Sequence, residues 1–114
     1  MPPAVRRFID LVASDAPIAI PGIVLQELLS GVKTAAEFRQ LDELLSGFPL
    51  LLASRRIHVR GAEIRNVCRL HGVAAATVDC LIAAHAVLED AELMTLDDDF
   101  ALIARHTALR LMPI

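Results

Sequence analysis

The sequence predicts an α/β domain with a mostly parallel sheet, and three observations lead to that class. Apolar residues recur at helical spacing in several segments, and short apolar segments typical of buried strands lie between them. Helices that connect successive strands in this way make those strands parallel. The 114 residues are enough for one domain with a core, and 55% apolar residues with only 4% aromatic residues indicate an aliphatic core.

The N-terminal half is predicted to contain three helices and two strands. The first helix covers residues 4–14, because Val5, Phe8, Ile9 and Val12 then share one face. The other elements expected in this half are a strand at 17–21 bounded by prolines, a helix at 23–30 ending near Gly31, a helix at 34–46 with Phe38, Leu41, Leu44 and Leu45 facing inward and Gly47 past its end, and a strand at 50–52.

The C-terminal half alternates in the same way, so residues 1–114 are interpreted as a single domain. Its expected elements are an amphipathic helix at 55–71 closed by Gly72, an alanine-rich helix at 77–90, a strand at 93–96, a short helix at 98–105 and a final strand at 109–112.

Composition limits the classes of function. With a net charge of −3, the whole molecule is not expected to attract nucleic acids, so any RNA contact needs a local basic patch. No apolar run approaches the roughly 18 residues of a membrane span, and the start does not resemble a signal peptide. Cys68 and Cys80 are too few for a disulfide framework and lack metal-ligand spacing, which indicates reduced thiols in a cytoplasmic protein.

Acidic residues occur within or directly after otherwise apolar segments. Glu27 and Asp79 each lie inside an apolar helical segment, and three aspartates at 97–99 directly follow Leu96. An ionised carboxylate on an apolar face is costly unless something compensates its charge. A shared cation would explain all of these positions, and ligand sets made only of oxygen suit Mg²⁺ or Mn²⁺ rather than Zn²⁺.

Each of these acids also has a purely structural explanation. Glu27 can lie at the rim of its apolar face and reach water, and Asp79 can favour a helix N-terminus as a cap or through the helix dipole. One aspartate among residues 97–99 can cap the following helix, but the remaining acids then repel one another unless a cation neutralises them.

The helix expected at 55–71 is the only strongly basic part of the chain. Its arginines, which face a single acid at position 63, are Arg55, Arg56, Arg60, Arg65 and Arg69. They form either a solvated helix face or a surface that contacts an RNA phosphate backbone. The four histidines show no mutual metal-ligand spacing, and no residue evidently activates a Ser or Cys nucleophile.

Several segments resemble the motifs of PIN-domain ribonucleases, and their order and spacing agree over nearly the whole chain. These segments are residues 18–31 with Glu27, residues 77–84 with Asp79, residues 94–100 with Asp97 and Asp99, and residues 103–111 near the end. Within that family, the sequence is similar to the VapC-type toxins of bacterial toxin–antitoxin pairs.

The resemblance implies a three-layer α/β/α fold and a metal-dependent endoribonuclease toxin, in which clustered carboxylates hold Mg²⁺ or Mn²⁺ for attack of water on RNA. It implies that Glu27, Asp79 and Asp97 are catalytic residues and metal ligands. Asp99 is a further metal ligand on the same grounds, and Thr95 is an auxiliary residue that hydrogen-bonds within the site. The implied partners are an RNA substrate and a cognate antitoxin, and a homodimer is expected.

The sequence does not show the segment with which PIN domains usually begin. PIN domains start with a strand that ends in Asp and a first helix, whereas this sequence starts after both, and neither Asp10 nor Asp15 matches that motif. Because that strand is central to the family's sheet, the sequence predicts an N-terminally truncated PIN-like domain. We expect the strands around residues 18–20 and 93–96 either to shift together or to expose edges that a neighbouring chain fills.

Two other classes of function were weighed against the nuclease. The first is a catalytically impaired or inactive PIN-like domain that only binds RNA or a partner, because one acid of the site is absent. The second is an α/β receiver domain, which also gathers acids at strand ends but needs a lysine after its last strand. The only lysine is Lys33, which does not fit that position.

Overall fold

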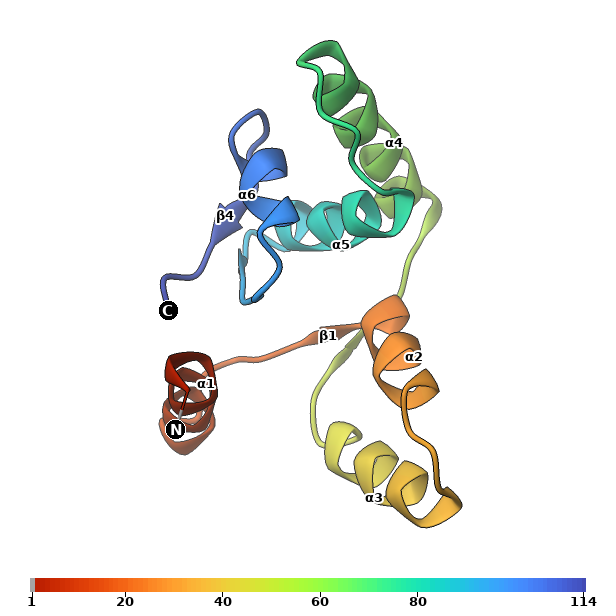
Figure 1. The fold of residues 1–114 in the computed structure, drawn as a ribbon, viewed down its shortest axis with the longest axis vertical. Helices are drawn as coiled ribbons and strands as arrows, with labels where there is room; N and C mark the ends of the chain where they lie inside the picture. The colour runs from red at the N-terminus through yellow and green to blue at the C-terminus, as the bar shows by residue number, and fades with distance from the viewer. Residues whose placement is uncertain (1) are drawn as a thin grey trace.

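A computed structural model describes residues 2–114 as a succession of helices and very short strands (Figure 1). In chain order the elements are α1 (Pro3–Ala13), β1 (Ile20–Pro21), α2 (Gly22–Ser30), α3 (Ala35–Leu45), β2 (Leu50–Leu51), α4 (Arg55–Leu70), α5 (Thr77–Leu88), β3 (Glu92–Leu93), α6 (Asp99–Ala104) and β4 (Arg110–Leu111). Every expected helix is present, with ends that differ from the expected ones by at most two residues.

The strands form two separate parallel pairs. β1 pairs with β2, with Ile20 opposite Leu50, and β3 pairs with β4, with Leu93 opposite Leu111. Parallel pairing confirms the α/β class that the sequence predicts. Within residues 2–114, however, β1 and β3 belong to different sheets, so the expectation that these strands shift together is wrong.

The strands are also shorter than expected, for reasons that are local. Proline at position 21 has no N–H to extend the ladder of β1. After β3, the backbone N–H of Asp97 bonds the side chain of Thr95 at 3.1 Å, so residues 94–96 turn away from the strand direction. The strand expected at 93–96 therefore ends at Leu93.

Side-chain caps and left-handed residues set several helix boundaries. Thr34 accepts a hydrogen bond from the N–H of Glu37 at the start of α3, and Ser54 accepts one from the N–H of Ile57 at the start of α4. Helix α5 ends at Leu88, two residues earlier than expected, because Asp90 takes a left-handed conformation with φ of 52°.

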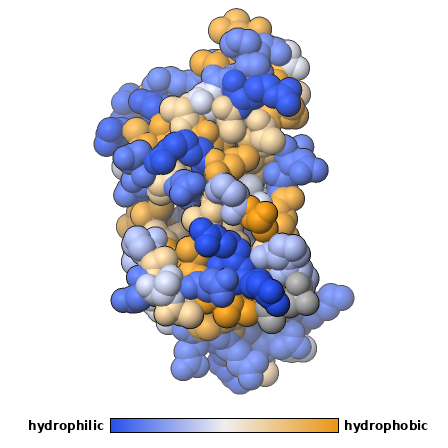
Figure 2. All heavy atoms as spheres, turned by 90° about the vertical axis from the view of Figure 1, so that its left-hand side faces the viewer, coloured by the Kyte–Doolittle hydropathy of each residue, from blue (hydrophilic) through white to orange (hydrophobic). Residues whose placement is uncertain are grey.

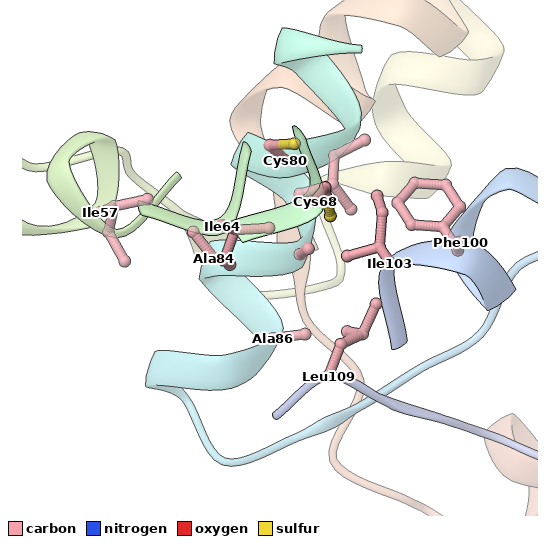
Figure 3. Packing of buried hydrophobic residues seen from close by; sticks show 11 residues of the cluster. Ile57, Ile64, Cys68, Cys80, Ala84, Ala86, Phe100, Ile103 and Leu109 are labelled. Carbon is pink, nitrogen blue, oxygen red and sulfur yellow. The ribbon is translucent and has the colours of Figure 1, made fainter. Parts of the chain in front are cut away.

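The buried core lies in the C-terminal half, where α4 crosses α5 and α6 packs beside them (Figure 3). The side chains of Ile64 and Cys68 on α4 meet those of α5, while Phe100 and Ile103 come from α6. Position 61 on α4 is glycine, and a Cβ there would lie 3.5 Å from the backbone oxygen of Cys80. The two helix backbones are therefore close at this position, where a Cβ would just make an ordinary contact.

The N-terminal half contributes little to this core. The apolar face of α1 is exposed, and on α3 Phe38 and Leu44 are 42% and 66% exposed, so the expectation that those two side chains face inward is wrong. The radius of gyration, 14.8 Å, exceeds the roughly 13 Å of a compact domain of this length. Figure 2 accordingly shows hydrophobic residues at the surface between hydrophilic ones.

None of the helices described here is both long and apolar enough to cross a membrane.

Candidate metal centre

Three aspartates converge where the first turn of α5 faces the loop that leads into α6. One carboxylate oxygen from each of Asp79, Asp97 and Asp99 lies within 4.8 Å of the other two. Asp79 is half-buried on α5, whereas Asp97 and Asp99 are exposed. The packing of α6 against α5 brings these acids together across a separation of about 20 residues in the chain.

The loop before α6 holds its acids in a defined arrangement. Thr95 accepts the hydrogen bond from the N–H of Asp97, and Oδ1 of Asp97 in turn accepts one from the N–H of Asp99 at 2.9 Å. One oxygen of Asp97 therefore stabilises the start of α6, as the structural interpretation of these acids requires. Oδ2 of the same carboxylate accepts no hydrogen bond from the described residues, so this oxygen remains available as a metal ligand.

The electrostatics of the cluster disfavour three free carboxylates. Burial raises the pKa of Asp79, and the negative charges of Asp97, Asp99 and Glu27 raise it further. The ion pairs among residues 2–114 are Arg60–Glu63 and Arg110–Asp90, so none of them neutralises the cluster. A bound cation would lower this repulsion.

Glu27 lies near the cluster but not inside it. It is on α2, which packs against α5, and its side chain is exposed rather than held in an apolar face. Its charge contributes least among the causes that raise the pKa of Asp79. Glu27 therefore lies close enough to act on the charge of Asp79 but outside the group of three aspartates.

The ligand set fits a hard divalent cation. All the donors are carboxylate oxygens, which Mg²⁺ and Mn²⁺ accept and Zn²⁺ does not favour without nitrogen or sulfur. Oxygens bound to one Mg²⁺ at 2.0–2.1 Å are roughly 3 to 4 Å apart, so small side-chain rotations would bring these aspartates into place. An ion held by two or three carboxylates would keep several of its waters, which is usual for Mg²⁺.

The sequence model of the PIN-domain family matches residues 2–106 of this chain. The chain belongs to the PIN-domain family. Its three clustered aspartates come from the segments whose sequence resembles the family's motifs, and the two parallel strand pairs with helices around them fit the same family.

Relatives and solved structures agree with this membership. Ribonuclease VapC11 of Mycobacterium tuberculosis is 35% identical over 93% of this chain and 79% of the relative. The structure of VapBC2 from Rickettsia felis bound to a promoter DNA fragment is similar with a TM-score of 0.78 at 30% identity, covering 97% of this chain and 85% of that one. A toxin–antitoxin complex from Klebsiella pneumoniae is similar with a TM-score of 0.62 at 28% identity, over 73% and 66% of the two chains.

The arginines of this PIN domain, grouped together in the sequence, do not form one surface. Arg65 and Arg69 line a hollow of about 320 Å³ beside residues 72–75, and Arg65 donates to the carbonyl oxygen of Ala75 at 3.2 Å. The arginines at positions 55, 56 and 60 line a different hollow, of about 440 Å³, near Leu88. The residues predicted to bind RNA are thus divided between two places.

Asp99, which the sequence analysis names as a further metal ligand, lies in one group with Asp79 and Asp97, and its backbone N–H bonds the side chain of Asp97 two residues earlier. One other feature of this PIN domain escaped the sequence reasoning. His85 is buried at 2% exposure, and its Nε2 has no hydrogen-bond partner among residues 2–114. No sequence pattern marks that histidine, because its burial results from helix packing.

Proposed function

We propose that this chain acts as a single PIN-like domain and is a metal-dependent endoribonuclease toxin of a toxin–antitoxin pair. The observation that carries the proposal is the convergence of Asp79, Asp97 and Asp99 without a basic partner among the described residues. Membership of the PIN-domain family and similarity to a VapC ribonuclease support the same chemistry.

In the proposed mechanism Asp79, Asp97 and Asp99 would hold Mg²⁺ or Mn²⁺, and Glu27, which lies near this group but outside it, would act at its edge. A divalent cation in this place supplies Lewis-acid activation of water and charge compensation at the RNA phosphate. Thr95 is a positioning residue, because its hydroxyl holds the backbone of Asp97. The exposure of Asp97 and Asp99 leaves the cluster open to a strand of RNA.

The partners follow from the same relatives. The structure from Klebsiella pneumoniae is a toxin–antitoxin complex, which supports a cognate antitoxin for this chain. The exposed apolar face of α1 supports self-association as a homodimer, since contiguous apolar patches mark protein interfaces. The unpaired thiols Cys68 and Cys80 support action in the reducing cytoplasm.

A cleavage assay with a defined RNA tests the nuclease function. We expect cleavage with Mn²⁺ or Mg²⁺, none with EDTA, and a loss of at least about 100-fold in Asp79→Asn and Asp97→Asn, since even outer-shell partners of metal sites are worth 10- to 100-fold. Asp98→Asn is the matched control, because Asp98 neighbours the cluster without belonging to it. Equal activity in all three variants would contradict the assigned site.

An inactive RNA- or partner-binding domain is the second candidate. The position of Glu27 outside the aspartate cluster favours it, because fewer carboxylates then face the ion. RNA binding by the unmodified chain without cleavage in Mn²⁺ would support this candidate over the nuclease.

A further inference from the structure

We propose that the hollow lined by Arg55, Arg56 and Arg60 is a second RNA phosphate site, separate from the cleavage centre, which only long RNAs reach. This inference rests on the proposed function, because it concerns how the same enzyme holds its substrate. The hollow has a volume of about 440 Å³ and lies between the N-terminal half of α4 and the end of α5.

The two arginine groups lie on opposite flanks of α4. At 100° per residue, Arg56 and Arg60 fall on one side of the buried stripe that contains Ile57 and Ile64, and Arg65 and Arg69 fall on the other side. Figure 3 shows α4 crossing α5 in the core. One flank therefore points toward the beginning of α5, and the other toward its end.

The residues that line each hollow show which arginine group lies nearer to the three aspartates. The hollow with Arg65 and Arg69 includes residues 72–75, which lead into the first turn of α5 and hence to Asp79. The other hollow includes Leu88, the last residue of α5, about 14 Å beyond Asp79 along the helix axis. The arginine group near Leu88 is therefore remote from the cleavage centre.

Acids within the described part of the chain balance little of the positive charge of this remote hollow. Arg55 and Arg56 occupy the first turn of α4, where the helix dipole disfavours cations, and that turn contains no acid. The ion pairs of residues 2–114 include neither of them. Arg60 meets Glu63 at 3.8 Å, and both side chains are exposed, which makes that pair weak.

An RNA backbone matches this lining better than a small anion does. Three guanidinium groups could contact successive phosphates of an RNA strand, although the protein as a whole carries a net charge of −3. Val59 and Leu88 add an apolar part to the lining, on which a ribose or base can pack. A stacked strand that advances about 3.4 Å per nucleotide needs about four nucleotides to cover 14 Å, so a stacked fragment of about three cannot occupy both places.

RNA affinity measured by fluorescence anisotropy tests the proposal in the full chain carrying Asp79→Asn, which prevents cleavage. We expect Arg56→Glu/Arg60→Glu to weaken binding of an RNA of about 20 nucleotides at least tenfold and to reduce the slope of log affinity against log salt by about two. Binding of an RNA of about three nucleotides should stay unchanged. Glu63→Gln should strengthen binding of the long RNA two- to fivefold, roughly, because it removes the only acid of the lining.

Arg7→Glu/Arg39→Glu is the matched control, because it makes the same change of net charge on α1 and α3. If this control variant weakens binding of the long RNA as much as the test variant does, the loss of affinity results from net charge and the proposal is wrong. Equal losses of affinity for long and short RNA would place the hollow at the cleavage centre and would also overturn the proposal. In the active chain, the test variant should raise KM for long RNA and leave kcat unchanged, whereas a chain that cleaves neither RNA would contradict the nuclease function itself.

Discussion

Oδ1 of Asp97 accepts a hydrogen bond from the backbone N–H of Asp99 at 2.9 Å. The bond fixes the carboxylate of Asp97 against the start of α6, while the side chain of Asp99 remains exposed beside it. Because Asp79 faces the same point from α5, two helix starts and one loop determine the shape of the cluster. The site therefore depends on the loop before α6 as much as on the acids themselves.

Asp79→Asn should stabilise the metal-free protein while removing its response to metal. The substitution relieves a carboxylate whose pKa is raised by burial and by Asp97, Asp99 and Glu27. Its melting temperature in EDTA should rise by about 2–4 °C, the effect of a gain near 0.5 kcal/mol in a small domain. Differential scanning fluorimetry with and without Mn²⁺ measures this, and equal stabilisation of both proteins by Mn²⁺ would show that Asp79 is not a ligand.

The contact between α4 and α5 should tolerate alanine at position 61 but not a larger side chain. In Gly61→Ala the added Cβ meets the backbone of Cys80 and Leu81 at ordinary van der Waals distances of 3.5 and 3.6 Å. The higher helix propensity of alanine then makes the change neutral or stabilising by up to about 1 kcal/mol. Gly61→Val should instead cost about 1–3 kcal/mol by overpacking.

Urea denaturation of the two Gly61 variants gives these free energies of unfolding directly. Gly31→Val serves as a comparison. Gly31 lies at the end of α2, where a Cβ would have only backbone oxygens of α2 within 4 Å. A Gly61→Val protein as stable as the unmodified chain would show that α4 and α5 separate at little cost.

Acidification should destabilise the protein through His85. Burial lowers the pKa of His85, and His58 lowers it further, against an opposite effect of Glu89. The unfolded chain then binds a proton that the folded chain does not, so the stabilisation present above pH 6.5 is lost as the pH falls below 6.5 toward the lower folded value. Free energies of unfolding at about pH 7.5 and pH 5.5 measure the loss.

His85→Leu should remove this dependence on pH. Because Nε2 of His85 is buried without a partner, an apolar side chain of similar volume avoids an unsatisfied polar group and should be neutral or stabilising at pH 7.5. His71→Leu is the control, since His71 is exposed at the end of α4. An unchanged slope of stability against pH in His85→Leu would assign the dependence to other groups.

The purified chain should self-associate through α1. Val5, Phe8, Ile9 and Val12 lie on one helical face and are 40–47% exposed, and the two strand pairs leave edges unjoined to each other. Val5→Glu/Ile9→Glu should lower the mass measured by multi-angle light scattering toward the 12.4 kDa monomer while changing stability little. Arg7→Glu, on the same helix, should leave the mass unchanged, and a monomeric unmodified chain would contradict the expectation.

Local patterns predicted the helices well, and they predicted the candidate site in part. Apolar spacing and caps such as Thr34 act within a few residues, so the sequence determines them directly. Strand extent was predicted less well, because it depends on a partner strand, and the side chain of Thr95 diverts the chain after β3. Within the candidate site, Asp99 lies with Asp79 and Asp97 as expected, whereas Glu27, expected on the same grounds, lies outside that group.

The sequence by itself determined the alternation of helices with short parallel strands, the aliphatic core and the acids at the edges of apolar segments. Only the tertiary structure decided that Glu27 lies outside the group formed by Asp79, Asp97 and Asp99, and that the arginines of α4 face two different hollows. The physical reason is that periodicity and capping are properties of neighbouring residues, whereas these placements follow from how α4 and α6 pack against α5. The separation of β1 from β3 has the same origin, because strand pairing requires contacts between segments far apart in the chain.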